Sequence, residues 1–170
     1  MKAPICSAQS VMLWTGLLAG LACASARADE TTAEIDRCLS AALAARPGIV
    51  TAWREIDGEG NGYNVRVLGT DGRIAETDCR PGETALGEFQ LRAGLYRIAM
   101  YQRAQTPESA ARELAPEIFA GPVRVVSMEL SVSLKGTPYY TYALVLPGQQ
   151  KATVEVDAAT GKPVTAKVVY

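Results

Sequence analysis

The sequence predicts an α+β fold made of two repeats, each with one helix packed on a small antiparallel β-sheet. Three observations support this prediction: an internal repeat of turn residues, two segments with helical periodicity, and several stretches of alternating apolar and polar residues. The composition, 48% apolar and 21% charged, is that of an ordinary globular domain. The formal net charge of -1 argues against a nucleic-acid partner.

The N-terminal segment, residues 1–28, has the features of a secretory signal peptide. Lys2 is followed by an apolar run over residues 11–24 and by an A-x-A cleavage pattern that ends at Ala28. The run is shorter than the roughly 20 apolar residues that span a membrane. We therefore expect a periplasmic or secreted protein. A membrane location is expected only if the signal stays uncleaved or if Cys23 is lipidated.

Cleavage after Ala28 leaves Cys38 and Cys79 as the two remaining cysteines. In an oxidising compartment two such thiols usually form a disulfide. They lack the C-x-x-C spacing of redox catalysts, so we expect a structural bridge.

The internal repeat predicts a first unit at residues 29–84 and a second at residues 106–170, joined by a connecting segment at 85–105. Asp78 and Gly82 in TDCRPG match Asp157 and Gly161 in VDAATG, and a tyrosine lies 19 residues before each glycine.

In the first unit, the spacing of Ile35, Cys38, Leu39, Ala42 and Leu43 predicts a helix that ends near Gly48. Strands are expected over residues 49–56, 63–68 and 73–79, with a tight hairpin turn before the last of them. Cys79 should point inward from its strand, toward the apolar face of the helix that carries Cys38.

In the second unit, Thr106 is expected to cap a helix with Pro107 at its first position. The buried stripe is predicted to be Ala111, Leu114 and Ile118. Alternation predicts strands over residues 126–134, 142–146 and 152–157, followed by a turn and a strand restart. The connecting segment should contain a helix with Leu91, Leu95 and Ile98 on one side.

The ending VEVDAATGKPV, with the divergent stretch RVLGTDGRIAETDCRPG, resembles the PepSY domain family. The resemblance implies a small non-catalytic module of the bacterial envelope. Such modules occur alone in secreted proteins and in the propeptides of some secreted metallopeptidases, where a peptidase-inhibiting role has been suggested. It implies no catalytic residues. We interpret the matched positions as turn-formers: Asp71, Gly72, Asp78, Gly82, Asp157 and Gly161.

The residue types argue against enzyme chemistry. The chain has no histidine, which removes the commonest general base and most zinc sites, and it has no G-x-S-x-G motif. We therefore expect no catalytic residues, no metal and no cofactor. Calcium ligation by Asp71, Glu155 and Asp157 would suit a hard cation, but no D-x-D-x-D-G pattern supports it.

Tyr139 and Tyr140 are the candidate partner-binding residues. They are neighbours on a predicted strand, so one of them must face away from the core, and an outward aromatic near a sheet edge is a common recognition anchor. The first functional hypothesis is a non-catalytic module that binds a protein partner there, with a peptidase as the partner that the family suggests. The second is a small-ligand or ion-binding envelope protein that uses the cleft between the two units.

Overall fold

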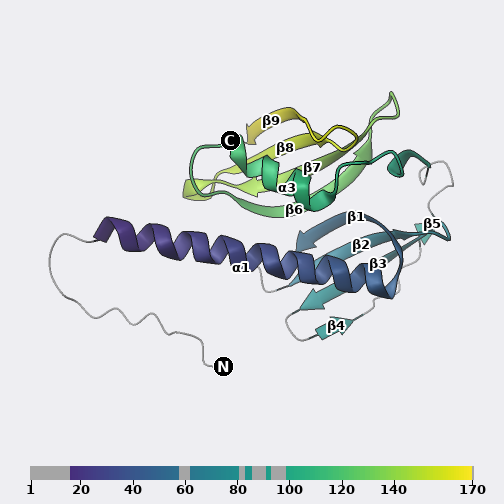
Figure 1. Ribbon diagram of the computed structural model, residues 1–170, viewed down its shortest axis with the longest axis horizontal. Helices are drawn as coiled ribbons and strands as arrows, with labels where there is room; N and C mark the ends of the chain where they lie inside the picture. Colours follow the sequence, from purple (N-terminus) through teal and green to yellow (C-terminus); the bar gives the residue numbers. More distant parts are fainter. Residues whose placement is uncertain (1–15, 58–61, 81–82, 86–90, 93–98, 170) are drawn as a thin grey trace.

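The computed structural model describes the backbone of most of the chain (Figure 1). The described ranges are 16–57, 62–80, 83–85, 91–92 and 99–169. Side chains are described over residues 31–57, 62–80 and 99–169. The first helix, α1 (Gly16–Ala45), runs through the predicted cleavage position, and the first part of the predicted signal peptide lies outside the described residues. No described helix is long and apolar enough to cross a membrane.

One antiparallel sheet of nine strands forms the centre of the fold. The strand order is β4-β3-β2-β1-β6-β7-β8-β9, and β5 also pairs with β3. The strands are β1 (Gly48–Glu55), β2 (Tyr63–Gly69), β3 (Arg73–Arg80), β4 (Glu83–Ala85), β5 (Leu91–Arg92), β6 (Arg124–Val132), β7 (Pro138–Val145), β8 (Lys151–Asp157) and β9 (Pro163–Val169), and a short 3-10 helix, η1 (Pro147–Gln149), precedes β8.

The prediction of two repeats, each with its own small sheet, is wrong. Strand β1 pairs with β6, placing Trp53 opposite Met128 and Arg54 opposite Ser127, so the strands of both predicted units form one continuous sheet. Two separate sheets would leave the backbone groups along the facing edges of β1 and β6 without partners, and pairing satisfies them. Residue alternation cannot reveal this junction, because backbone groups are the same in every residue.

Helices α1 and α3 (Glu108–Glu117) lie on the same face of the sheet (Figure 1). Helix α1 packs on β1, β2 and β3, whereas α3 packs on β6, β7 and β8. Both helices contribute to one apolar core, and no described helix covers the opposite face, which we call the open face. The predicted α1 stripe is confirmed, since its members Ile35, Cys38, Leu39 and Ala42 are buried and Leu43 packs partly buried against the core.

Helix α3 differs from its prediction. Pro107 rather than Thr106 is the N-cap residue, and no side chain caps the helix. Of the predicted stripe, Ala111 is buried as expected, Leu114 is only half-buried and Ile118 is exposed, while Arg112 and Ala115 are the other buried residues. The two alanines let the helix lie close to the large side chains of β7, which displaces the expected stripe.

The connecting segment also differs from its prediction. Leu91 belongs to β5 and pairs with Ile74 of β3, so at this residue the chain is a strand rather than a helix. Leu95 and Ile98 lie outside the described residues. The β-strand at Leu91 satisfies backbone groups on the outer side of β3, which helical periodicity cannot anticipate.

Candidate functional site

The predicted disulfide between Cys38 and Cys79 is present, with the two Cα atoms 5.7 Å apart. Cys38 lies on the apolar side of α1, and Cys79 lies opposite Tyr63 on the inward face of β3. Both residues are buried. The bond therefore ties the helix to the sheet that it covers, as expected of a structural bridge.

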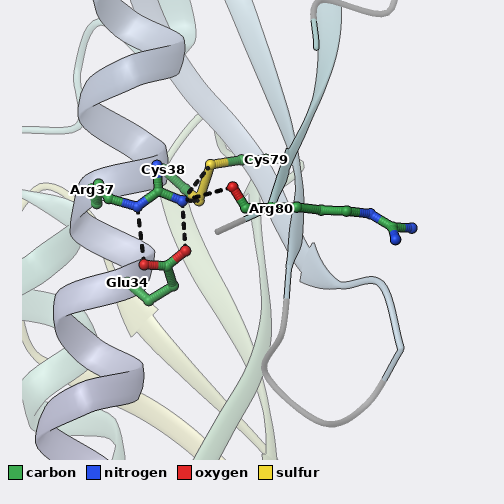
Figure 2. Close-up of a disulfide and its surroundings, with 5 residues drawn as sticks. All are labelled: Glu34, Arg37, Cys38, Cys79 and Arg80. Atoms are coloured by element: carbon green, nitrogen blue, oxygen red, sulfur yellow. Dashed lines mark hydrogen bonds and ion pairs between the residues drawn. A yellow bond between two sulfur atoms is a disulfide. The ribbon is translucent and has the colours of Figure 1, made fainter. Parts of the chain in front are cut away.

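Arg37 lies over this disulfide (Figure 2). Its Nη2 donates hydrogen bonds to Cys79 Sγ at 3.3 Å and to the Arg80 carbonyl at 3.1 Å, while its Nε donates to Glu34 Oε2 at 2.9 Å. The hydrogen bond from Arg37 lowers the pKa of Glu34. The Arg80 side chain points away from the sulfurs (Figure 2). Arg37 thus covers the disulfide on its solvent side.

The two candidate tyrosines occupy opposite faces of β7. Tyr140 is buried, its hydroxyl donates a hydrogen bond to the Thr106 carbonyl at 3.0 Å, and burial raises its pKa to about 12. Tyr139 is half-buried on the open face, opposite Asp157 of β8. Strand β7 lies between β6 and β8, so neither tyrosine lies at a sheet edge, contrary to the prediction. Tyr140 is a core residue, and Tyr139 alone of the pair faces away from the core.

Tyr139 lines a hollow of about 350 Å³ on the open face. We call this the open-face hollow, and its lining residues are Ser133, Thr137, Tyr139, Glu155, Asp157 and Val164. Asp157 also closes the turn after β8, because its Oδ1 accepts hydrogen bonds from the backbone N–H groups of Ala159 and Thr160 at 2.8 and 3.0 Å. The interpretation of Asp157 as a turn-former is therefore confirmed.

Strand β9 forms the outer edge of the sheet beside this hollow. It pairs with β8 on one side, and every residue from Pro163 to Val169 is exposed or half-buried. Val164 is 62% exposed and Val169 is 56% exposed, so both leave apolar surface on the edge strand. The register shift between Glu155 and Val156 places Val164 at an irregularity of the β8–β9 ladder.

The other matched turn positions have local partners. Asp71 accepts hydrogen bonds from the Arg73 backbone N–H and from Arg46 Nη2, and these two donors lower its pKa. Asp78 accepts a hydrogen bond from Asn64 Nδ2 at 2.8 Å. Gly72 and Gly161 adopt left-handed φ values of 78° and 71°, which suit glycine. Gly82 lies outside the described residues.

The three ligands considered for calcium do not come together, because Asp71 lies apart from Glu155 and Asp157. Asp71 is paired with Arg46 at the β2–β3 turn, while Asp157 is at the end of β8. Among the side chains that the structure describes, no three His, Cys, Asp or Glu residues group as a metal site.

A buried polar network that the sequence reading missed joins the two helices to the sheet. Trp53 Nε1 of β1 donates a hydrogen bond to Glu108 Oε1 at 2.9 Å, and the Tyr142 hydroxyl donates to the Glu108 carbonyl at 3.1 Å. Arg112 Nη2 pairs with Asp36 of α1 and lies 3.8 Å from Glu108 Oε2. The sequence pattern that could have indicated this network is the i, i+4 spacing of Glu108 and Arg112 on a short helix.

The network leaves several buried polar atoms without hydrogen-bond partners. They include Glu108 Oε2 and the Nε and Nη1 atoms of Arg112, a residue only 4% exposed. Burial raises the pKa of Glu108, against the opposing effects of the Arg112 charge and the Trp53 hydrogen bond. Titratable groups with such perturbed pKa values often mark functional clefts, although structural networks also produce them.

An open groove of about 310 Å³ lies beside this network, between α1 and α3. Its lining combines the apolar residues Leu39, Leu43 and Val50 with residues that carry side-chain oxygen atoms. The oxygen-bearing residues are Asp36, Ser40, Glu108 and Ser109. We call this the interhelical groove. It occupies the position expected for the cleft of the second functional hypothesis.

Comparison with known proteins gives little further information. No protein-family model matches the chain, and no curated protein matches it. A crystal structure described as that of a candidate lipoprotein from Clostridium difficile 630 aligns with a TM-score of 0.45 at 13% sequence identity, covering 71% of this chain and 82% of the other. A likeness at this level does not establish a shared fold.

Proposed function

We propose that this protein is an exported, non-catalytic binding module that holds an extended segment of a protein partner along β9. The observation that carries the proposal is the exposed edge of the sheet formed by β9. Strand β9 is seven residues long, lies outermost in the sheet, and exposes both Val164 and Val169. An added strand would gain main-chain hydrogen bonds along this edge and would cover the two valines.

The opposite end of the sheet is less suited to this role. Strand β4 spans only Glu83–Ala85, which is the kind of short strand that discourages further pairing. The lysine on β9, Lys167, is the usual device against unspecific edge pairing. We infer that β9 is selective for its partner rather than closed to all strands.

Export is supported by two features of the chain. The N-terminal segment has the charge, apolar run and A-x-A order of a signal peptide. The buried disulfide of Cys38 and Cys79 suits an oxidising compartment.

The identity of the partner is proposed from the PepSY resemblance. VEVDAATGKPV covers most of β8, the following turn and the start of β9, so the segment that carries the resemblance also forms the proposed edge. A peptidase is the partner that this resemblance favours, and binding at the edge would modulate it without any reaction by this chain.

Site-specific photo-crosslinking in the envelope tests the proposal. A photoreactive phenylalanine analogue replaces Lys167 on β9 in one variant and Glu113, an exposed residue of α3, in the other. We expect partner adducts from position 167 and none from position 113. Adducts of equal yield at both positions, or none at position 167, would contradict the proposal.

Blocking the edge provides the matched control. Lysine at Val164 and Val169 should abolish the adducts, because charged edge residues oppose strand addition. Lysine at Leu134, an exposed apolar residue outside β9, should leave them unchanged.

A second candidate function is a small-ligand site in the interhelical groove. It is favoured by Glu108, which lines the groove and whose buried Oε2 atom lacks a hydrogen-bond partner. Native mass spectrometry of the purified protein would reveal a retained ligand. If a ligand is present, Ser40→Leu should displace it by filling the groove, and a ligand that stays bound in that variant would exclude the site.

A further inference from the structure

We infer that the open-face hollow recognises a lysine or arginine side chain of the segment that docks on β9; this inference rests on the proposed function. The hollow joins the edge strand to the interior of the sheet, because Val164 of β9 and Tyr139 of β7 both line it. It therefore lies where a side chain of an added strand could enter.

The geometry gathers two carboxylates around one aromatic ring. Asp157 lies directly opposite Tyr139 in the β7–β8 ladder. Glu155 lies two residues before Asp157 and so projects from the same face of β8, roughly 7 Å away along the strand. Ser133 and Thr137 also line the hollow.

The charges of these two carboxylates are not neutralised within the described part of the chain. Neither Glu155 nor Asp157 forms an ion pair with a described lysine or arginine. Elsewhere on the open face, Glu76 of β3 is paired with Arg66 of the adjacent strand. Lys151 of β8 and Lys167 of β9 project from the same face, but neither forms an ion pair with Glu155 or Asp157.

A basic side chain fits this set of groups better than other occupants. Both turn hydrogen bonds of Asp157 use Oδ1, which leaves Oδ2 for a further donor. A guanidinium or ammonium group can bind both carboxylates and also lie against the tyrosine ring. A hard metal ion would need more oxygen ligands than these two side chains provide.

A strand paired with β9 would hold a basic side chain in position to reach the hollow. A strand added to β9 would run about 4.8 Å from it. The long stem of a lysine or arginine can cross that distance and lie over Val164, which keeps the charged end near Glu155. Main-chain pairing at β9 would give affinity, and the hollow would select the side chain.

Nuclear magnetic resonance titration of the purified, isotope-labelled protein tests the inference. The probes are two blocked five-residue peptides, Thr-Val-Xaa-Val-Thr, in which Xaa is arginine or citrulline, its neutral isostere. We expect the arginine peptide to shift the resonances of β9 and of Tyr139, and we expect the citrulline peptide to bind about tenfold more weakly.

Variants of the hollow separate charge from shape. In Glu155→Gln with Asp157→Asn, the preference for arginine should disappear, and the asparagine oxygen can still accept the two turn hydrogen bonds. Glu129→Gln removes a carboxylate from exposed Glu129 of β6, outside the hollow, and should preserve the preference. Thermal unfolding of each variant checks that the fold is intact.

The possible results distinguish the inference from the proposed function. Equal affinity for both peptides, with shifts along β9, would overturn the role of the hollow and leave the edge proposal standing. If neither peptide shifts β9 at millimolar concentration, both are contradicted. Preference for arginine that survives in the double variant would also overturn the inference.

Discussion

Trp53 of β1 donates its indole N–H to Glu108 Oε1 of α3 at 2.9 Å, across the junction where β1 pairs with β6. The bond joins a strand from the first half of the chain to a helix from the second. Its acceptor is a buried carboxylate that also lies 3.8 Å from Arg112.

The first prediction concerns the pH dependence of stability. Burial raises the pKa of Glu108 above its ordinary value of 4.5, so the native state binds this proton more tightly than the unfolded state does. The resulting stabilisation is fully present below the unfolded pKa and is lost as pH rises through the raised native pKa. The free energy of unfolding of Glu108→Gln, minus that of the wild type, should therefore increase as pH rises from about 4 to about 8.

Urea unfolding at a series of pH values measures this difference. Glutamine keeps an oxygen acceptor for Trp53, so the comparison isolates the charge. Burial also raises the pKa of Glu55, but that effect is common to both proteins and cancels in the difference. Glu113→Gln, at an exposed position of the same helix, should leave the pH profile unchanged. A constant difference between Glu108→Gln and the wild type would exclude the raised pKa.

The second prediction concerns Arg112, which supplies the nearest cation to Glu108. Arg112→Met should destabilise the fold at neutral pH by about 3 kcal/mol or more, because it leaves a buried carboxylate without a compensating charge. Adding Glu108→Gln should recover part of that loss. Asp36→Asn should cost at most about 1 kcal/mol, since the Asp36 side chain is 52% exposed. Equal costs for Arg112→Met and Asp36→Asn would contradict this order.

The third prediction concerns the disulfide. Cys38 and Cys79 are separated by 41 positions, and opening the loop should destabilise the fold by about 4 kcal/mol on the chain-entropy estimate. Urea unfolding of Cys38→Ala with Cys79→Ala, compared with the wild type, gives the value. Arg37→Gln keeps the bond and should cost far less, because Arg37 is a surface residue. Free thiols in the unfolded, unreduced wild-type protein would refute the bond.

The fourth prediction concerns Gly48 at the start of β1. A β-carbon there would lie 2.1 Å from the Leu68 carbonyl oxygen, which is backbone and cannot move aside without shifting β2. Gly48→Ala should therefore cost about 2 to 3 kcal/mol. Gly148→Ala should cost about 1 kcal/mol, because Gly148 has a left-handed φ of 76° but nothing within 4 Å of the added carbon. Thermal unfolding ranks the two, and the reverse order would contradict the clash.

Local pattern determined several elements of this protein. Helical spacing placed Cys38 on the face of α1 that covers the sheet, and strand parity placed Cys79 on the facing side of β3, so their bond could be expected from the residues. Alternation in β6 and β8 likewise marked buried Met128 and Val154. These predictions succeed because side-chain direction depends on neighbours three or four residues away in a helix and two residues away in a strand.

The tertiary structure decided how those elements meet. The pairing of Trp53 with Met128 merges the strands into one sheet through backbone groups that carry no sequence signature. Pairing with both β6 and β8 makes β7 an interior strand, which removes Tyr139 and Tyr140 from the edge. The β1–β6 pairing brings α1 and α3 together, so that Arg112 is buried between Asp36 and Glu108. Local periodicity can identify a buried face, but long-range contacts determine which strands become neighbours and which charges they enclose.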